Sequence, residues 1–286
     1  MPEIKRSSKK IIVSASRRQD IPAYRLTRLL DQVKEGCFRW TQPYSGKEMT
    51  LTMKNHDILS IVLWSKDFGP YLASPRASSI LEPMNPYFIF TINDSPELEP
   101  GLQTSLDERI EQAARIIDQY GEARLLWRFD PIVHWITPSG EFKNNLEPFD
   151  FIAEKMAALG VTRCVFSFAQ IYGKVIKRQK KLGIRFIDPD MGYKLEKVRN
   201  MADFAMDLGI TLMSCCQPEL VKAHQNVVHG ACIDGRHVAE TFGVDPNLVD
   251  TRPHPSRKGC GCTKSIDIGS YEPCPNSCTY CYANPV

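Results

Sequence analysis

The sequence has no long apolar run. No stretch approaches the roughly 18 apolar residues that a membrane-spanning helix requires, and the basic first residues lead only into the short apolar segment Ile11 to Val13. That segment is too short for the hydrophobic part of a secretory signal. We therefore expect a cytoplasmic protein without a membrane partner.

A large net charge of either sign is also absent. The 286 residues include 36 basic and 33 acidic side chains, which gives a formal net charge of +3. A balance so close to zero provides no overall electrostatic attraction for a nucleic acid or a membrane surface. It favours a small-molecule substrate over a nucleic acid, and an anionic ligand would have to be held by a local group of basic residues.

The six histidines lack the spacings of a histidine metal site. Neither H-x-x-x-H nor H-E-x-x-H occurs, so a metal centre built on histidine is not expected. Cysteine, by contrast, is plentiful. Ten cysteines in a chain expected to be cytoplasmic favour metal or redox chemistry over disulfides.

Short apolar runs without alternation recur along the chain, as in strands that are buried on both faces of a parallel sheet. The predicted strands are Ile11 to Ala15, Leu59 to Trp64, Tyr87 to Ile92, Arg124 to Phe129, Arg163 to Phe168, Ile210 to Cys215, Ala231 to Ile233 and Ser265 to Ile268. Amphipathic helices lie between them. A capping box, Ser105-x-x-Glu108, begins one helix, and Gly160 and Gly209 end two others. This alternation predicts a TIM-like βα barrel of parallel strands.

Two stretches interrupt the alternation. Phe38 to Met53, with Pro43 and Gly46 between alternating segments, predicts an inserted β-hairpin. Thr251 to Thr263 is rich in proline, glycine and basic residues, which predicts an irregular linker. We therefore divide the chain into a barrel over residues 1–250 and a C-terminal unit over residues 251–286. This unit comprises the linker, a last strand and a cysteine loop packed on the barrel mouth.

Charged residues gather directly after the predicted strands. In βα barrels the catalytic face is formed where strands end and loops begin, so the candidate catalytic residues are Arg17, Arg18, Asp20, Lys66, Arg128 and Asp130. The planar guanidinium of arginine suits bidentate binding of a carboxylate or phosphate, so we expect an anion-binding mouth. The alternative is that these charges only brace the barrel as ion pairs, such as Arg17 with Asp20 and Arg128 with Asp130.

The most specific pattern lies in the C-terminal segment Tyr271 to Ala283, which reads Tyr-Glu-Pro-Cys-Pro-Asn-Ser-Cys-Thr-Tyr-Cys-Tyr-Ala. Cys274, Cys278 and Cys281 have a C-x3-C-x2-C spacing, and Tyr280 directly precedes the third cysteine. A loop with this spacing can bind three corners of a [4Fe-4S] cube and leave the fourth iron without a protein ligand. A closed cluster with a fourth cysteine, or a structural zinc ion, is the alternative, although zinc sites usually consist of two short-spaced pairs.

This loop resembles the cluster loop of radical S-adenosylmethionine (SAM) enzymes. The resemblance implies a [4Fe-4S] cluster on Cys274, Cys278 and Cys281 with Tyr280 beside it, and SAM bound at the free iron. It also implies reductive cleavage of SAM to start radical chemistry on an unidentified anionic substrate, with an electron donor such as flavodoxin or ferredoxin. The Gly-Gly-Glu segment that receives the SAM amino group in many of these enzymes is not recognisable. The alternative function is a non-catalytic barrel protein that binds an iron–sulfur cluster or zinc structurally.

In radical SAM enzymes the cluster loop follows the first strand, whereas here it comes last. With the segment Ser-Ala-Ser-Arg-Arg-Gln-Asp-Ile-Pro at 14–22, this arrangement is similar to an uncharacterised family, domain-of-unknown-function family 1848, over nearly the whole chain. Parallel pairing of Ser265 to Ile268 with Ile11 to Ala15 would bring the loop to the mouth beside Arg17, as in a circular permutation. The alternative is a separate tail outside the barrel.

Five further cysteines fall at predicted strand ends or in the linker: Cys215, Cys216, Cys232, Cys260 and Cys262. Four thiolates complete a tetrahedral zinc site or an auxiliary cluster. We therefore predict a second metal site made by Cys232, Cys260, Cys262 and one of the adjacent pair, with Cys216 as the first choice. The alternative is that they are thiols or packing residues. Cys37 and Cys164 have apolar neighbours and are predicted to be core residues.

Overall fold

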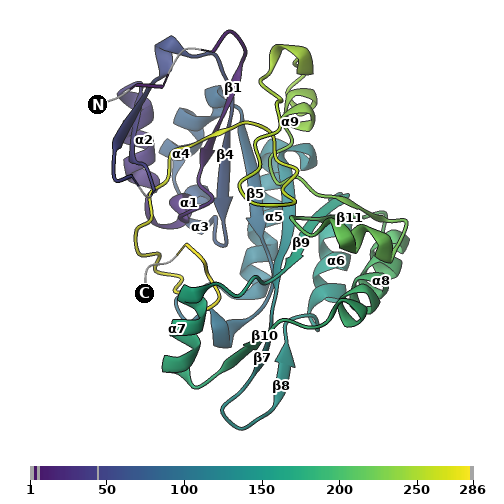
Figure 1. The fold of residues 1–286 in the computed structure, drawn as a ribbon. Helices are drawn as coiled ribbons and strands as arrows, with labels where there is room; N and C mark the ends of the chain where they lie inside the picture. The colour runs from purple at the N-terminus through teal and green to yellow at the C-terminus, as the bar shows by residue number, and fades with distance from the viewer. Residues whose placement is uncertain (1–2, 5–6, 44, 284–286) are drawn as a thin grey trace.

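The computed structural model describes residues 3–4, 7–43 and 45–283, and its central feature is a parallel sheet of eight strands (Figure 1). Along the sheet the strands follow the order β12-β11-β9-β6-β5-β4-β1-β13, and each neighbouring pair is parallel. Their bounds are β1 Ile11–Ala15, β4 Ile58–Ser65, β5 Pro86–Thr91, β6 Leu125–Ile132, β9 Arg163–Phe168, β11 Thr211–Ser214, β12 Val227–His229 and β13 Ile266–Asp267. The predicted mixed α/β fold with parallel strands is confirmed.

Helices connect successive strands, as the alternation predicts. They are α1 Ile21–Tyr24, α2 Leu26–Lys34, α3 Gly69–Leu72, α4 Pro75–Leu81, α5 Leu106–Tyr120, α6 Phe149–Ala158, α7 Gly173–Leu182, α8 Met191–Asp207 and α9 Gly235–Thr241. The predicted capping box begins α5, where the Ser105 hydroxyl accepts from the N–H of Glu108 and the Glu108 carboxylate accepts from the N–H of Ser105. No helix in the described ranges is both long and apolar enough to cross a membrane.

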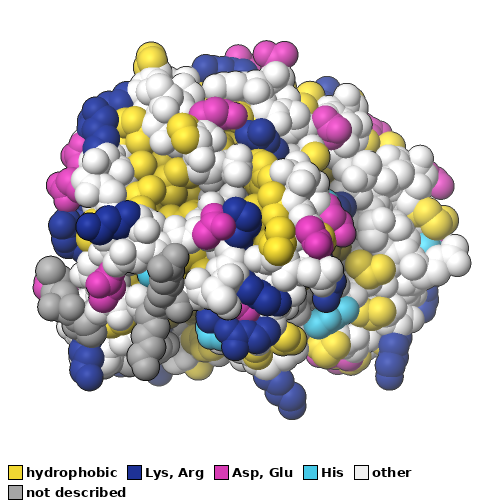
Figure 2. All heavy atoms as spheres, turned by 90° about the horizontal axis from the view of Figure 1, so that it is seen from above, with side chains coloured by type: hydrophobic (Ala, Val, Ile, Leu, Met, Phe, Trp, Pro, Cys, Tyr) yellow, Lys and Arg dark blue, Asp and Glu magenta, His cyan; other side chains and the backbone are white. Residues whose placement is uncertain are grey.

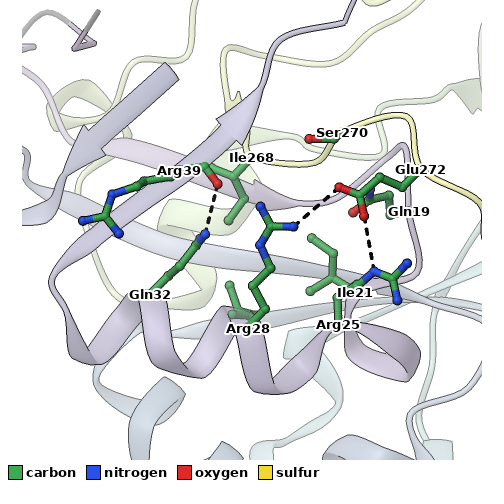
Figure 3. Close-up of a pocket in the computed structure, with 10 residues that line it drawn as sticks. Gln19, Ile21, Arg25, Arg28, Gln32, Arg39, Ile268, Ser270 and Glu272 are labelled. Atoms are coloured by element: carbon green, nitrogen blue, oxygen red, sulfur yellow. Dashed lines mark hydrogen bonds and ion pairs between the residues drawn. The ribbon is translucent and has the colours of Figure 1, made fainter. Parts of the chain in front are cut away.

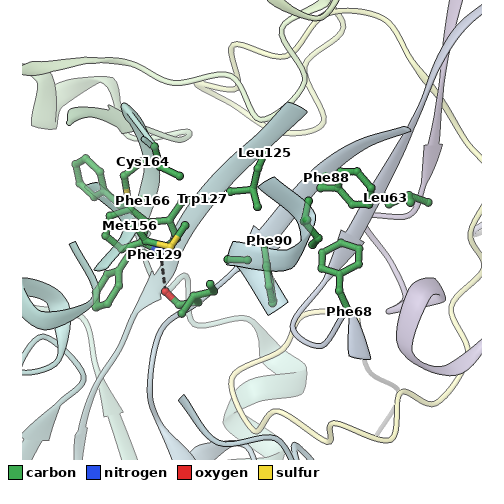
Figure 4. Packing of buried hydrophobic residues seen from close by; sticks show 14 of the residues in the cluster. Leu63, Phe68, Phe88, Phe90, Leu125, Trp127, Phe129, Met156, Cys164 and Phe166 are labelled. Atoms are coloured by element: carbon green, nitrogen blue, oxygen red, sulfur yellow. Dashed lines mark hydrogen bonds between the residues drawn. The ribbon is translucent and has the colours of Figure 1, made fainter. Parts of the chain in front are cut away.

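The core consists of large apolar side chains between the sheet and its helices (Figure 4). Trp127 on β6 is fully buried, stacks on Phe149 of α6 with 5.7 Å between ring centroids, and donates its Nε1–H to the carbonyl of Ile92 (2.9 Å). Such aromatic pairs fix the position of a helix over a sheet. Cys164 lies in this core and Cys37 is also buried, so both are core residues as predicted.

Two small antiparallel units flank the main sheet. The predicted hairpin is formed by β2 Cys37–Thr41 and β3 Glu48–Thr52, whereas residue 44 at its turn lies outside the described residues. The other unit was not predicted and pairs β7 His134–Ile136 with β10 Arg185–Ile187 and β8 Phe142–Asn144. Basic and acidic side chains are interspersed over the face seen in Figure 2, in keeping with the near-zero net charge.

The predicted closed barrel is not confirmed, because the sheet is open. Within the described ranges β12 and β13 are its edges and do not pair with each other. The linker lies between these edges, where the N–H of Thr263 donates to the carbonyl of Ile233 (3.0 Å). Its prolines and glycines are unsuited to a regular ladder. The strand predicted at Ala231 to Ile233 is wrong, because these residues join no ladder and β12 lies earlier in the chain; Ile233 bonds to the linker instead.

The last strand pairs with the first, as predicted. β13 runs parallel to β1 with Val13 opposite Ile266, and the N–H of Ile268 donates to the carbonyl of Ser14 (3.0 Å). The chain beyond Ile268 therefore begins at the carboxyl edge of the sheet, beside the end of β1. Figure 1 shows this yellow C-terminal segment continuing toward α7. Residues 284 to 286 of the predicted C-terminal unit lie outside the described residues.

Candidate functional site

The cysteine loop, residues 274 to 281, is folded by two tight turns. The N–H of Ser277 donates to the carbonyl of Cys274 (3.0 Å), and the N–H of Cys281 donates to that of Cys278 (3.1 Å). Ser277 has φ +51°, a left-handed conformation that is uncommon outside glycine. Burial raises the pKa of Cys278 well above its usual value, and the nearby thiols of Cys281 and Cys274 add to that effect. The three predicted cluster ligands are thus neighbours in space.

Side chains and backbone from two other segments anchor this loop. The amide of Asn276 accepts a hydrogen bond from the Tyr24 hydroxyl (2.6 Å) and donates to the Asp20 carboxylate (3.1 Å). The N–H of Thr279 donates to the carbonyl of Leu98 (2.8 Å). These bonds hold the loop to the chain that follows β1 and to the chain that follows β5.

Gly101 lies where the chain after β5 packs against the backbone of the cysteine loop. Its N–H donates to the carbonyl of Asn276 (3.1 Å). A Cβ atom at this position would lie 1.7 Å from the carbonyl oxygen of Pro275, far inside contact distance. Only glycine fits here without displacing the loop.

Asp20, a predicted catalytic residue, supports the loop and does not pair with Arg17. Its carboxylate accepts hydrogen bonds from the Ser65 hydroxyl (2.6 Å) and the N–H of Lys66 (2.9 Å). Burial raises the pKa of Asp20 to about 6, against these hydrogen bonds, which lower it. Arg17 forms its ion pair with Asp267 on β13 instead (3.8 Å).

A buried polar network lies beside the loop. The hydroxyl of Tyr280 donates to the carboxylate of Glu99, which is 2% exposed, and Glu99 also binds the ammonium of Lys66 (2.9 Å). Lys66 donates in addition to the side chain of Asn93 (2.6 Å). Burial raises the pKa of Tyr280 well above its usual value, and the Glu99 charge adds to this. Tyr280 is therefore a neutral donor that ties the loop to an ion pair.

Arg178 of α7 holds the other side of the loop. Its guanidinium donates to the carbonyls of Cys278 (3.1 Å) and Cys281. Burial lowers the pKa of Arg178, with the thiols of Cys281 and Cys278 acting in the opposite direction. A cation at this point favours negative charge on the loop.

Arg17 and Arg128 meet over one indole ring. Their guanidinium carbons lie 5.4 Å and 5.2 Å from the ring of Trp64 on β4. Arg128 also pairs with Asp130, as the alternative reading of these charges predicts, and Asp130 accepts from the hydroxyl of Ser167. The Nε atoms of both arginines are buried without a hydrogen-bond partner. Each therefore retains a donor for a ligand.

Arg18 is turned away from this pair. It donates to the Asp267 carboxylate (3.2 Å) and the Gly269 carbonyl (2.8 Å), and so braces the last strand. Lys66 belongs to the network beside the cysteine loop. The predicted group of basic residues is thus divided, and only Arg17 and Arg128 come together.

The five cysteines of the predicted second site lie in contact with one another; we call them the five-cysteine group. Sγ of Cys215 is 3.5 Å from that of Cys216 and 3.7 Å from that of Cys232. The Cys262 sulfur lies near those of Cys232 and Cys260, and the Cys260 sulfur also lies near that of Cys216. Among the described residues, no three or more His, Cys, Asp or Glu side chains surround one position as ligands of a metal ion would.

A small pocket lies on the outer side of the C-terminal segment, against α2 (Figure 3). Glu272 pairs there with Arg25 (3.4 Å) and Arg28 (3.5 Å). Its volume of about 20 Å³ is room for little more than one water molecule, so the pocket fits neither SAM nor a substrate. We interpret these ion pairs as a brace for the segment between β13 and the cysteine loop.

Comparison with protein families matches the chain over most of its length. A family model described as Domain of unknown function (DUF1848) covers residues 12–283, from β1 through the cysteine loop. The chain belongs to this family. Membership in DUF1848 confirms the family resemblance, and the description of the family names no activity. No curated protein matches the chain.

Several residues around the site of this DUF1848 protein were missed by sequence reasoning. They are Tyr24, Trp64, Glu99, Gly101, Arg178, Asp267 and Asn276. Only Asn276, which lies inside the C-x3-C spacing, had a local signal that could have marked it. Most of the others come from segments distant from the loop, such as Arg178, which follows a strand by several residues on a basic helix that is typical of a solvated surface.

Proposed function

We propose that this protein is an iron–sulfur enzyme that cleaves SAM reductively to start radical chemistry on a small anionic substrate. The observation that carries the proposal is the parallel pairing of β13 with β1. This pairing delivers a C-x3-C-x2-C loop to the carboxyl edge of the sheet, directly beside the end of the first strand. Ligand sites of parallel sheets lie at that edge.

The residues of the loop fit a [4Fe-4S] cluster. Three thiols lie within one short loop, and the N–H groups of Asn276 and Asp20 donate to the Cys274 sulfur. Hydrogen bonds of this kind stabilise cluster thiolates. A cube binds each thiolate at a different iron, so the three sulfurs need not surround one position. Burial raises the pKa of Cys274 to about 11, and a cationic cluster would offset that cost.

Cys274, Cys278 and Cys281 would hold the cluster, which would supply the electron for reductive cleavage of SAM, taken in turn from a donor such as flavodoxin or ferredoxin, and would so start radical chemistry on the substrate. The chain's own residues form the surroundings of the cysteine loop. Tyr280 and Glu99 fill the inner side of the loop and keep water from it. Arg178 fixes the loop backbone through two carbonyls.

Arg17 and Arg128 are suited to bind the anionic groups. Their unpartnered Nε donors and planar guanidiniums match a carboxylate, either that of SAM or that of the substrate. The chain directly after the loop reaches Arg17 through Tyr282, whose hydroxyl donates to the carbonyl of Arg17 (2.9 Å). Asp130 next to Arg128 offers an acceptor for an amino group. These side chains would replace the Gly-Gly-Glu segment that the sequence lacks.

Anaerobic purification, iron counting and chemical reduction with SAM test this function. We expect 5′-deoxyadenosine from the unaltered protein and from the control variant Cys37→Ala, whose cysteine lies in the core away from the loop. Cys278→Ala should release none, because a cube held at three corners does not persist on two. Intact SAM after full reduction of a fully loaded cluster would favour the non-catalytic binding protein.

A further inference from the structure

We propose that the five-cysteine group is a second metal–thiolate centre that holds more than one metal atom, either as zinc ions or as an iron–sulfur cluster. The inference is independent of SAM cleavage, because it rests on contacts of residues outside the cysteine loop.

Three separate segments bring these cysteines together. Cys215 and Cys216 directly follow β11, Cys232 follows β12, and Cys260 and Cys262 lie in the linker before β13. In an extended strand, successive side chains point to opposite faces. Cys216 instead has φ +61°, a left-handed conformation, and its sulfur lies 3.5 Å from that of its neighbour. Strain at a non-glycine residue persists where the surroundings require it, as at binding sites.

Glycines allow the three segments to approach to backbone contact. A Cβ at Gly230 would lie 2.8 Å from the carbonyl oxygen of Ser214, and one at Gly261 would lie 2.6 Å from that of Gly230. A Cβ at Gly259 would lie 2.9 Å from the carbonyl oxygen of Cys216. The sulfurs are therefore held by close backbone packing and not by flexible loops.

Positive charge surrounds the group. The guanidinium of Arg17 lies beside the Cys262 sulfur, and that of Arg257 lies beside the Cys216 sulfur. Arg128 lies within electrostatic reach of Cys232 and Cys215. Asp267 and Asp130 pair with Arg17 and Arg128 and offset part of the cost of burying them, whereas neutral thiols would offset none of the remaining positive charges. Thiolates on a metal carry net negative charge and would balance them.

The sulfur spacing matches shared metal ligands. Two thiolates on one tetrahedral ion with metal–sulfur bonds of about 2.3 Å lie about 3.8 Å apart. The two contacts of Cys215 are 3.5 Å and 3.7 Å, close to that value and far from the roughly 2.05 Å of a disulfide. Neighbouring sulfurs continue from Cys216 through Cys260 and Cys262 back to Cys232, so the five sulfurs form a ring. The ring presents its sulfurs as adjacent pairs and not as one set around a single position, so we infer that different pairs would bind different metal atoms.

The test uses the full chain with Cys274, Cys278 and Cys281 all replaced by alanine, purified anaerobically, so that the cysteine loop contributes no metal. Zinc, iron and acid-labile sulfide are then counted per chain. We expect about two or more metal atoms. Zinc without sulfide identifies a zinc–thiolate centre, and iron with sulfide identifies a cluster. At most one metal atom per chain, of either kind, overturns the proposal.

Two further variants in this background separate metal binding from folding. Cys232→Ser with Cys262→Ser should remove the metal. Gly261→Ala keeps all five cysteines but forces the linker away from β12, so it should lower the metal content severalfold, whereas Gly173→Ala, whose Cβ meets nothing within 4 Å, should not. Circular dichroism confirms that each variant is folded. Metal that stays at the original level in the folded Cys232→Ser, Cys262→Ser variant also overturns the assignment.

Discussion

Gly101 shows how a single residue outside any motif can control the proposed cluster. It belongs to the segment after β5, yet it limits how close the cysteine loop can lie, because a Cβ would overlap the carbonyl oxygen of Pro275. Overpacking of this kind typically costs about 1–3 kcal/mol. The loop, held by a few hydrogen bonds at the surface of the sheet, will move before the core does.

We therefore expect Gly101→Ala to weaken iron binding at the cysteine loop about tenfold, since about 1.4 kcal/mol corresponds to a factor of ten. Iron titration of the apoprotein, followed by absorbance, measures the effect. The melting temperature should change little. Gly173→Ala serves as the control. Unchanged iron affinity in Gly101→Ala would mean that the loop accommodates the methyl group and that the close approach has no role in binding.

At the scale of elements, the last strand depends on one carboxylate. Asp267 accepts hydrogen bonds from the Ser16 hydroxyl (2.8 Å), the N–H of Arg17 (2.9 Å) and the guanidinium of Arg18 (3.2 Å). β13 has only two residues in its ladder, so the ladder alone gives it little stability. The Asp267 carboxylate adds stability to β13, because it joins this strand to the loop after β1.

Replacing Asp267 by alanine should detach β13, because removing one partner of a buried charged pair costs about 3–5 kcal/mol. We expect faster proteolysis within residues 265 to 283 and loss of iron from the cysteine loop, while the larger part of the sheet still unfolds cooperatively. Asp57→Ala is the control, since Asp57 pairs with Lys10 at the surface and is 63% exposed. Equal protease resistance of both variants would show that other contacts hold the strand.

The elements that the sequence predicts best are those with local signals. β1 and β9 have the predicted bounds, and α5 begins at its capping box. The three strands of the small antiparallel sheet have three residues each, too few for a periodic pattern to emerge. Whether the sheet closes depends on how the linker packs between β12 and β13, and no local pattern specifies that.

The residues of the candidate site likewise divide into those that a local sequence pattern predicts and those that no local pattern predicts. Cysteine spacing identified the loop, and the grouping of the other five cysteines followed from their positions at strand ends. Glu99 and Arg178 could not be found, because each reaches the loop through a contact that spans a long stretch of sequence, such as the bond from Tyr280 to Glu99. Tertiary structure alone selects these two from the many charged residues of the chain.

For the whole molecule, the structure predicts a loss of stability in mild acid through His134. This side chain is 1% exposed, stacks on Phe168 (5.8 Å), and its Nε2 lies 3.2 Å from the Tyr193 hydroxyl. Burial, followed by the charges of Lys194 and Lys197, lowers its pKa to about 4. The folded protein therefore holds His134 neutral at pH values where the unfolded chain, with a pKa of about 6.5, binds a proton.

The contribution of His134 is fully present above pH 6.5 and is lost as the pH falls toward 4. A pKa lowered from 6.5 to about 4 corresponds to about 3 kcal/mol of unfolding free energy. Urea unfolding of the apoprotein between pH 7.5 and 4.5 measures this loss. His134→Gln should have a flatter pH profile over that interval. A profile parallel to that of the unaltered protein would assign the acid sensitivity to other groups.

The pairing of β1 with β13 also sets the order of events during synthesis. Ser14 and Asp267 meet across 253 positions of sequence, so their contact closes one of the longest loops in the chain and must form late. On the ribosome, most of the sheet can assemble before the cysteine loop emerges. Arg17 and Asp20 are then already in place at the edge of the sheet. Under the proposed function, iron would therefore meet a scaffold that is already folded, and a nascent chain would expose its three loop thiols only when the groups that bury them are in place.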